Sequence, residues 1–342
     1  MAQTQPLPTI AAVLPNYNHE RYLPFSLEGI CSQSLPPKEV FVVDDASTDG
    51  SVAVIQEFAR RYPFVHLIRN ERNIGCVNSF RRGWEQVTAD CVTFPAADDL
   101  LLPGLFEKSA KMLQRYPQAG LCSSLVGLLS PDGKDLGPYE TSVISPVECY
   151  VPPERYVETY REHENWILSY SAIYRSPCVK AVGMEDPELG PPADAVMGRE
   201  IAMRFGSCFI PERLAMWRPP VSGSFSQNID FKMAVELHER IARRLREPTG
   251  RAPTKDELEY LALWSRRIEL EHLGLLLEEK PTPYGQIAIV LGRLPDPSLV
   301  ERALLAMARS PLRLKAPLKL YHFASQRPAE RRRILRRKLG FQ

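Results

Sequence analysis

Two pairs of adjacent aspartates, each placed directly after or close behind an apolar run, are the residues of this sequence best suited to chemistry. Asp44-Asp45 follow the run at 39–43, and Asp98-Asp99 follow the run at 91–94. Adjacent carboxylates repel each other unless something binds them. Hard oxygen ligands suit Mg²⁺ or Mn²⁺, which also share their coordination sphere with phosphate oxygens. The paired acids therefore predict a site for a divalent cation and a diphosphate.

A purely structural interpretation of the same residues is a turn followed by a capped helix. Asp, Ser and Thr are common at such positions because they hydrogen-bond to nearby backbone groups. Ser47 or Thr48 would cap the helix after the first pair, and Asp98 or Asp99 would cap the helix after the second. A cap needs only one such residue, so the doubled acids favour the interpretation as a metal–diphosphate site.

Alternating strands and helices must position these acids. We expect strands at 9–15, 39–43, 65–68 and 91–94, and helices at 22–34, 51–61 and 78–87. The strands are apolar on both faces, which is typical of a parallel sheet covered by helices on each side. Ligands of such sheets bind beyond the carboxyl ends of the strands. The predicted fold is therefore α/β, and it brings both acid pairs to one edge of the sheet.

The 342-residue chain is long enough for about two domains, at ~150 residues each. After residue 226 the strand-rich pattern gives way to helices, so we predict a catalytic domain at 1–226 and a helical C-terminal region at 227–342. Thr254 and Glu257 form a capping box at the start of a long helix. His238 lies in an apolar stripe, and we expect it to be a packed histidine rather than a ligand.

Features of the whole chain predict a cytoplasmic location. No uncharged apolar run approaches the ~20 residues that cross a bilayer, and the N-terminus lacks the basic and apolar segments of a signal peptide. The seven cysteines are odd in number and form no CxxC pair. This pattern suggests neither a zinc site nor a disulfide framework, and it fits a reducing compartment.

The net charge of +2 is distributed unevenly. Residues 309–342 hold eleven Lys and Arg residues against one acid. Within them, the stretch 327–342 surrounds a few leucines and an isoleucine with arginines, which fits weak contact with an anionic membrane surface and fits a solvated terminus equally well. No basic motif interleaved with aromatic residues is present, so we expect no nucleic-acid partner.

Four motifs, in matching order and spacing, resemble the family 2 glycosyltransferases, which have the GT-A fold. They lie at 11–18, 42–49, 73–75 and 96–99, and a later segment at 182–205 resembles the acceptor side of the same family. The likeness spans residues 8–226. It implies a Rossmann-like, mostly parallel sheet flanked by helices. It also implies transfer of a sugar, with inversion, from a nucleotide diphosphate sugar to an acceptor hydroxyl.

The resemblance also implies roles for individual residues. Those placed at the nucleotide and donor are Pro15, Tyr17, Asp44, Asp45, Asn73, Arg81 and Asp98. Asp45 would accept a hydrogen bond from a ring N–H of the base, with Asp44 as the second candidate. Asp99 would hold Mn²⁺ or Mg²⁺. Asp194 falls where the family keeps its general base, and Glu188 and Asp186 are reserve candidates.

Three departures from the family pattern affect these roles. Ala96 stands where an acid often precedes the metal pair, and Ala193 stands where an acid often precedes the base. No histidine follows Arg218, so phosphate contact there would fall to Arg218, Ser222 or Ser224.

The expected partners are a nucleotide diphosphate sugar, with a UDP-sugar favoured, and a saccharide or lipid-linked saccharide acceptor in bacterial glycan assembly. The alternative is a module that binds a nucleotide sugar without catalysing transfer, because this sequence lacks some of the acids of the family pattern. A sugar-phosphate nucleotidyltransferase is less favoured, since it needs a glycine-rich phosphate loop and residues 9–20 contain no glycine.

Overall fold

The structure, a computed structural model, divides the chain into two compact units. Unit 1 comprises Met1–Ile229 with Glu247–Ala252, and unit 2 comprises Asp230–Arg246 with Pro253–Gln342. The residues that the structure describes are 6–139, 142–163, 166–184, 187–190, 193–219, 231–248, 251–278, 284–295, 297–309 and 315–325. The two units are described separately.

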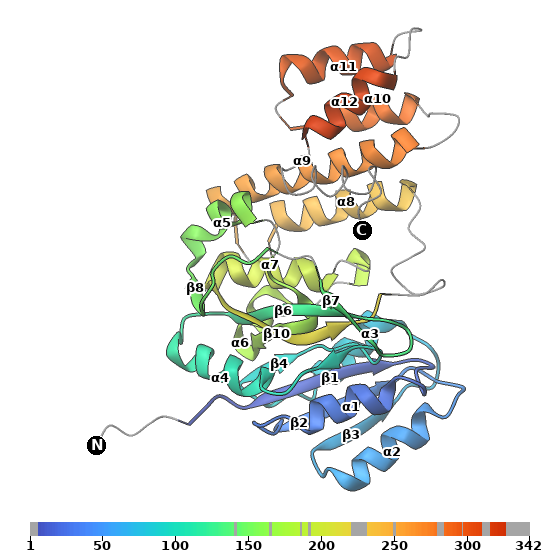
Figure 1. Ribbon diagram of the computed structural model, residues 1–342, viewed down its shortest axis with the longest axis vertical. Coiled ribbons are helices and arrows are strands. Elements are labelled where there is room, and N and C mark those ends of the chain that lie inside the picture. The colour runs from blue at the N-terminus through green and yellow to red at the C-terminus, as the bar shows by residue number, and fades with distance from the viewer. Residues whose placement is uncertain are drawn as a thin grey trace. The chain divides into compact units, whose positions relative to one another are not determined.

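The first half of unit 1 is the parallel sheet expected from the sequence (Figure 1). Its strands are β1 (Ile10–Asn16), β2 (Glu39–Asp44), β3 (Val65–Arg69) and β4 (Cys91–Thr93). Strand β1 lies between β2 and β4, and β3 pairs with β2, all in parallel. The carboxyl ends of these strands therefore meet at one edge of the sheet.

The second half of the sheet is mixed. Its strands are β5 (Leu100–Leu101), β6 (Leu121–Leu129), β7 (Asp135–Pro138), β8 (Cys149–Val151), β9 (Ile173–Arg175) and β10 (Ser207–Trp217). The strand order is β3-β2-β1-β4-β9-β6-β10-β5. Strand β9 is antiparallel to both β4 and β6, while β6 and β10 are parallel. The two-residue strand β5 runs antiparallel to β10.

Helices cover both faces of the sheet. Those of unit 1 are α1 (Leu23–Cys31), α2 (Ser51–Arg61), α3 (Cys76–Trp84), α4 (Leu105–Arg115), α5 (Tyr156–His163), α6 (Ser176–Val182) and α7 (Ala193–Phe205). Leu14 of β1 belongs to one apolar cluster with residues of α1, α2 and α4. Val13, which points the other way, faces Gly83 of α3, where an added Cβ would lie 2.5 Å from its Cγ1 atom. Both sides of β1 are thus buried, as its apolar sequence predicts.

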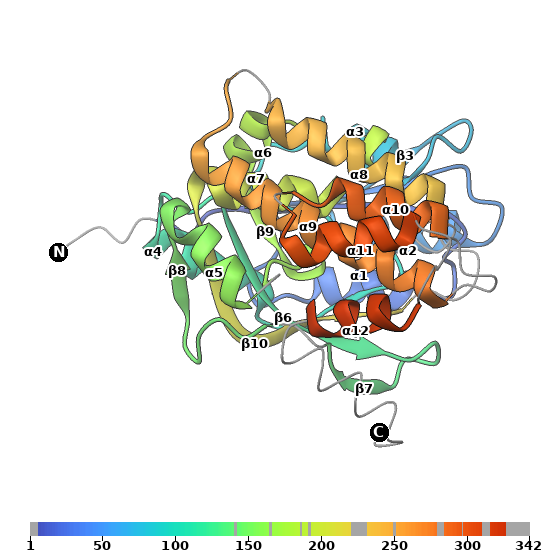
Figure 2. The ribbon, with the colours of Figure 1, turned by 90° about the horizontal axis from the view of Figure 1, so that it is seen from above.

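Unit 2 is helical, and Figure 2 shows its helices, with α10 beside α11. They are α8 (Phe231–Arg246), α9 (Lys255–Glu278), α10 (Tyr284–Arg293), α11 (Leu299–Arg309) and α12 (Lys315–Ser325). The predicted capping box is confirmed: the Thr254 N–H donates to Glu257, and the Glu257 N–H donates to the Thr254 hydroxyl. Ser298 and Glu301 form a second box at the start of α11.

Two further expectations concern the chain as a whole. Among the described helices, none is both long and apolar enough to cross a membrane. No disulfide joins the seven cysteines, all of which lie in the described residues. Burial raises the pKa of the Cys31, Cys91 and Cys208 thiols to about 12, which keeps them protonated and unreactive at neutral pH.

Candidate active site

The first acid pair lies at the carboxyl ends of β1 and β2, where Asn16 stands opposite Asp44 in register. Asp44 is fully buried. Its Oδ1 atom accepts from the side-chain amide of Asn16 at 3.1 Å, and its Oδ2 atom accepts from the Ser47 N–H at 3.2 Å. Asp44 therefore stabilises the turn after β2, which agrees with the interpretation of this residue as part of a turn.

Asp45 is buried as well, but it holds a different part of the chain. Its Oδ1 atom accepts from the Asn70 side chain and from the Ile74 N–H, each at 2.8 Å, and its Oδ2 atom accepts from the Gly75 N–H at 2.9 Å. A carboxylate oxygen has two lone pairs. Both lone pairs of Oδ1 are thus occupied, while Oδ2 keeps one for a further donor.

The helix cap expected at Ser47 or Thr48 is not formed. Helix α2 begins at Ser51, and its N-cap Gly50 makes no side-chain hydrogen bond. Ser47 accepts from the Asn18 N–H at 3.0 Å, and the Thr48 N–H donates to the Asn18 side chain at 2.8 Å. These two residues therefore tie the loop after β2 to the loop after β1, which carries Tyr17.

The remaining candidates at the nucleotide line the loops around Asp45. Pro15 is buried at the end of β1, whereas Tyr17 is 44% exposed. Asn73 accepts from the Gly75 N–H at 3.1 Å, in the loop that Asp45 holds. Arg81 is exposed on α3, while its neighbour Arg82 donates to the side chain of Asn70. The structure thus brings Asn73 to Asp45 and uses Arg82 to support the same loop.

The second acid pair precedes β5, and the pairing of β5 with β10 determines what lies beside it. Met216 stands opposite Leu100, so Arg218 comes next to Asp99, and the Arg218 N–H donates to Oδ1 of Asp99 at 2.8 Å. Asp99 is buried and Asp98 is half-buried. Burial, together with the neighbouring Asp98 carboxylate, raises the pKa of Asp99 well above its ordinary value.

The structural alternative for the second pair, a helix cap, is wrong. Helix α4 begins only at Leu105, and its N-cap is Gly104 at φ 90°, a left-handed conformation that suits glycine. Asp98 and Asp99 lie ahead of the intervening strand β5. Neither carboxylate is at the start of a helix, so capping does not account for the pair.

The side chain of Arg218 is engaged within the protein. Its guanidinium donates to the backbone carbonyls of Asp98, at 3.0 Å, and of Ser130, and it lies 4.5 Å from the centroid of the Tyr22 ring. These contacts position the segment that carries Asp98 and Asp99. Ser222 and Ser224, the other candidates for phosphate contact, lie outside the described residues.

Asp194 lies in the first turn of α7, where a negative charge is favourable. It is half-buried, and Oδ1 accepts from the Ala195 N–H. Burial raises the pKa of its carboxyl, against the lowering effect of a hydrogen bond with Ser169. Of the two reserve candidates, Glu188 is exposed and Asp186 lies outside the described residues.

Tyr170 is affected by the charges of Asp194 and of the second acid pair. Its side chain is half-buried, and burial together with the charges of Asp194, Asp99 and Asp98 raises its pKa. The proposed base and the proposed metal-binding acids thus all disfavour ionisation of the same phenol.

An aromatic cluster, which the sequence analysis did not single out, lies at the same place. The ring of Tyr170 stacks on Trp217 at 5.4 Å between centroids, and Tyr139 meets Trp217 edge-on at 5.3 Å. All three side chains are half-buried. The one sequence signal for this cluster was the position of Trp217, directly before Arg218 at the end of an apolar strand.

Comparison with known proteins shows which proteins this chain is similar to. Residues 11–142 match the family Glycosyl transferase family 2. "Putative glycosyltransferase EpsE" of Bacillus subtilis is 33% identical over 110 residues, which are 32% of this chain and 40% of that relative. "Putative teichuronic acid biosynthesis glycosyltransferase TuaG" of the same organism is 27% identical over 131 residues, which are 38% of this chain and 51% of the relative. The chain therefore spans about half or less of the length of these relatives.

Solved structures share the fold. S. aureus TarS in complex with UDP matches with a TM-score of 0.65 and 18% identity, covering 92% of this chain and 89% of that one. The mannosyltransferase PcManGT from Pyrobaculum calidifontis, in complex with GDP-Man and Mn²⁺, matches with a TM-score of 0.54 and 20% identity over 93% of this chain and 87% of that one. The expected GT-A type of α/β fold is thereby confirmed. The extent of both matches shows that they also include residues of the helical region.

Proposed function

We propose, from the premise that residues 11–142 carry a family 2 glycosyltransferase domain, that this protein is a metal-dependent, inverting glycosyltransferase. It would move a sugar from a nucleotide diphosphate sugar to an acceptor hydroxyl. The similarity to this family supports a transferase, and we infer the metal and the stereochemistry from the acids at the site.

The observation that carries the proposal is the state of Asp99. This carboxylate is buried next to Asp98, and its ionised form is disfavoured. The guanidinium of Arg218 donates to carbonyl oxygens instead of to the two carboxylates. Oxygen donors of this kind fit Mn²⁺ or Mg²⁺, with Asp99 as the main protein ligand. A bound cation would offset the charge that accumulates on the departing diphosphate.

The chain's own residues would orient the donor. Asp45 has one lone pair on Oδ2 left to accept a ring N–H of the base, and the exposed ring of Tyr17 offers a surface beside it. Asp98, which is half-buried, would contact the ribose or the donor sugar. Asn73 and Arg81, on and after the loop held by Asp45, would face the diphosphate side.

Asp194 would act as the general base. The acceptor hydroxyl loses its proton to this carboxylate as its oxygen attacks the anomeric carbon on the face opposite the diphosphate. The raised pKa of Asp194 makes it a better proton acceptor than an ordinary aspartate. A single displacement inverts the anomeric centre, so no covalent intermediate is expected.

The partners are inferred from the chemistry of similar proteins. S. aureus TarS binds UDP and UDP-GlcNAc, and PcManGT binds GDP-Man with Mn²⁺, which supports a nucleotide-sugar donor; we favour a UDP-sugar. The name of TuaG refers to teichuronic acid biosynthesis, which supports a saccharide or lipid-linked saccharide as the acceptor. We place the protein in the cytoplasm, with residues 327–342, outside the described residues, at an anionic membrane face.

A two-step experiment tests the proposal. A thermal-shift screen of nucleoside diphosphates and nucleotide sugars with Mn²⁺ identifies the donor, since a ligand at 100 times its Kd adds about 2.7 kcal/mol of stability. Release of the nucleoside diphosphate is then followed with a panel of saccharide acceptors, with and without EDTA. Turnover that EDTA abolishes supports the proposal. Binding without turnover on any acceptor would support a module without catalysis, and full turnover in EDTA would remove the metal.

A further inference from the structure

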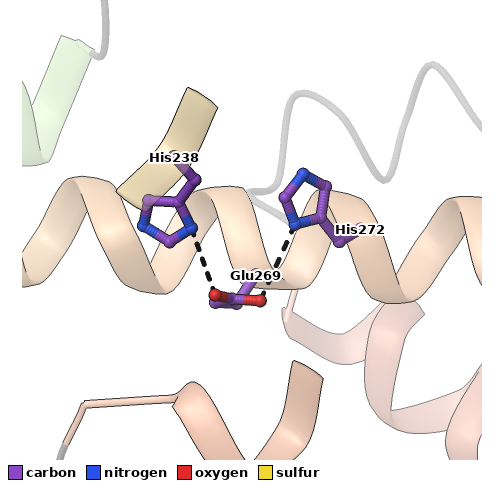
Figure 3. Close-up of side chains that lie close together, drawn as sticks. All are labelled: His238, Glu269 and His272. Atoms are coloured by element: carbon purple, nitrogen blue, oxygen red, sulfur yellow. Dashed lines mark ion pairs between the residues drawn. The ribbon is translucent and has the colours of Figure 1, made fainter. Parts of the chain in front are cut away.

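A second group of chemically suitable side chains lies in the helical unit 2. His238 of α8, together with Glu269 and His272 of α9, forms a buried cluster whose side chains point toward one another (Figure 3). Their exposed fractions are 8%, 1% and 5%. From the sequence we expect His238 to be a packed histidine rather than a ligand; it is buried, and the proximity of Glu269 and His272 reopens the question of ligation.

The helices explain how the three side chains meet. Glu269 and His272 are three residues apart on α9, so they lie on the same face of that helix. His238 reaches them from the neighbouring helix α8. The ring of Trp264, also on α9, meets His238 edge-on at 4.9 Å between centroids.

The distances within the cluster match the requirements of a metal ion. The Nδ1 atom of His238 lies 3.1 Å from Oε1 of Glu269, and the Nδ1 atom of His272 lies 3.7 Å from Oε2. The ligand atoms of all three residues lie within 4.8 Å of one another. Ligands placed 2.0–2.1 Å from a tetrahedral Zn²⁺ are roughly 3.3 Å apart, so small side-chain movements would bring all three to one ion.

The two histidines lie at different distances from the Glu269 carboxylate. The contact between His238 and Glu269 is within hydrogen-bonding distance, but 3.7 Å between His272 and Glu269 is too long for a hydrogen bond. A buried carboxylate needs partners, and both imidazoles lie beside this one. A cation held between the three side chains would interact with both imidazoles and the carboxylate at once.

We propose that His238, Glu269 and His272 bind a structural transition-metal ion, with Zn²⁺ the favoured metal, and that this ion links α8 to α9. Two nitrogen donors and one carboxylate suit Zn²⁺, whereas Mg²⁺, Mn²⁺ and Ca²⁺ prefer oxygen ligands alone. Water or the second carboxylate oxygen completes the coordination. The site is separate from Asp98 and Asp99, and it is independent of the transferase proposal.

The position of the cluster within unit 2 suggests what the ion would do. One apolar cluster of this unit consists of residues from α9 to α12, whereas the buried apolar side chains of α8 (Leu237, Ile241, Ala242 and Leu245) lie outside that cluster. The pair His238–Glu269 is one of the polar contacts by which α8 is attached to α9. A metal at this point would therefore fasten the first helix of the unit to its longest helix.

The test measures metal bound to the purified full chain after dialysis. The chain carries Asp99→Asn, so that the acid pair in unit 1 does not contribute. We expect one Zn²⁺ per chain. Addition of Co²⁺ to the metal-free protein should give the visible absorption of a four-coordinate Co²⁺ ion, and Zn²⁺ should raise the melting temperature more than Mn²⁺ does.

Variants locate the ion. His238→Gln and His272→Gln should each weaken Zn²⁺ binding more than about 100-fold, because loss of an outer-shell partner alone costs about 10–100-fold. His66→Gln, which removes an exposed imidazole from β3 of unit 1, is the matched control and should bind Zn²⁺ like the parent. Unchanged Zn²⁺ binding in both cluster variants would overturn the proposal. If those variants do not fold, the parent decides: no bound Zn²⁺ and no Co²⁺ spectrum in the folded parent protein would overturn the proposal equally.

Discussion

Asp99 is the residue most important to the proposed function, because it would be the main ligand of the cation. The fold itself does not favour its charged form. Burial and the Asp98 carboxylate raise its pKa, and the Arg218 N–H offsets this only in part. Residues that are unfavourable for stability but kept in place are typical of functional sites. The cost of the charged form should therefore be measurable apart from activity.

The Asp99→Asn variant should be more stable than the parent when metal is absent and the pH is neutral. The asparagine keeps an oxygen to accept the Arg218 N–H but carries no charge. We expect a higher melting temperature in EDTA, by thermal denaturation, together with loss of metal-stimulated transfer. A variant that is less stable at neutral pH, or one that keeps full metal-stimulated activity, would contradict this role.

The raised pKa of Asp99 also determines how the difference in stability between the parent and Asp99→Asn depends on pH. A folded-state pKa above the unfolded-state value means that the folded protein holds the Asp99 proton more tightly. The parent therefore loses stability as the pH rises from the unfolded-state pKa of Asp99 to its folded-state pKa. The advantage of Asp99→Asn should therefore be small near pH 4, grow as the pH rises, and level off above the folded pKa of Asp99. Melting temperatures measured across this range in EDTA check the sign.

Asp194 is the second residue whose role is tested by a single substitution. Asp194→Asn keeps the first turn of α7 polar, so the protein should fold normally. A general base would lose about 10²–10⁴-fold in turnover, while affinity for the donor stays nearly unchanged. Glu188→Gln, at an exposed position, is the control. Wild-type turnover in Asp194→Asn, together with a loss of turnover in Glu188→Gln, would assign the general base to Glu188 instead of Asp194.

At the scale of elements, the site depends on how strand ends and loops are tied together. Asp45 joins the end of β2 to the loop before α3 through three hydrogen bonds. Gly75, at the end of that loop, has φ 88°, which favours glycine. Asp45 is therefore a structural anchor in the absence of nucleotide, whatever it does when nucleotide is bound.

Asp45→Ala should weaken both the fold and the affinity for nucleotide. Hydrogen bonds to a charged group contribute about 1.5–3 kcal/mol, and the variant leaves the Ile74 and Gly75 N–H groups without this acceptor. Asp45→Asn should be nearly as damaging, since its amide N–H₂ would face one of these backbone donors. Urea denaturation gives the stability, and calorimetric titration with UDP gives the affinity. Unchanged UDP affinity in both folded variants would leave Asp45 with the structural role alone.

The elements that the sequence predicts well are those with strong local patterns. Strands β1, β2 and β4 are short runs that are buried on both faces, and the capping box at Thr254 is a local signal, so both were predictable. The pairing of β5 with β10 was not, because β5 has two residues and the bond from Arg218 to Asp99 joins positions 119 apart in the chain. Ser47 and Thr48 have the composition of a helix cap, yet they bind Asn18, a contact across two loops.

The same limit applies to the candidate sites. Asp98 and Asp99 could be identified because adjacent acids after a strand are unusual in themselves. The stacking of Tyr170 on Trp217 depends on long-range packing that no local pattern encodes. Likewise, the sequence around His238 does not predict that Glu269 and His272, which lie on another helix, are its neighbours. Only the folded structure shows this.

At the scale of the whole molecule, the basic segment 327–342 is the clearest feature left to test. Each basic residue near an anionic surface contributes about 1 kcal/mol of binding, so several together should hold the protein on a membrane at low salt. We expect co-sedimentation with vesicles that contain anionic lipid and none with neutral vesicles. Deletion of 327–342 should abolish it, and binding that persists after the deletion would exclude this segment as the cause.

The central claim, that Asp99 and a divalent cation together bind the nucleotide diphosphate, is tested most directly by calorimetric titration of UDP into the full chain. The titration is made with Mn²⁺ and again with EDTA, for the parent and for Asp99→Asn. We expect Mn²⁺ to strengthen UDP binding at least about tenfold in the parent, a difference of about 1.4 kcal/mol, and to leave UDP binding to Asp99→Asn unchanged. Equal affinity of the parent for UDP in Mn²⁺ and in EDTA would show that no cation at Asp99 contributes to binding of the diphosphate.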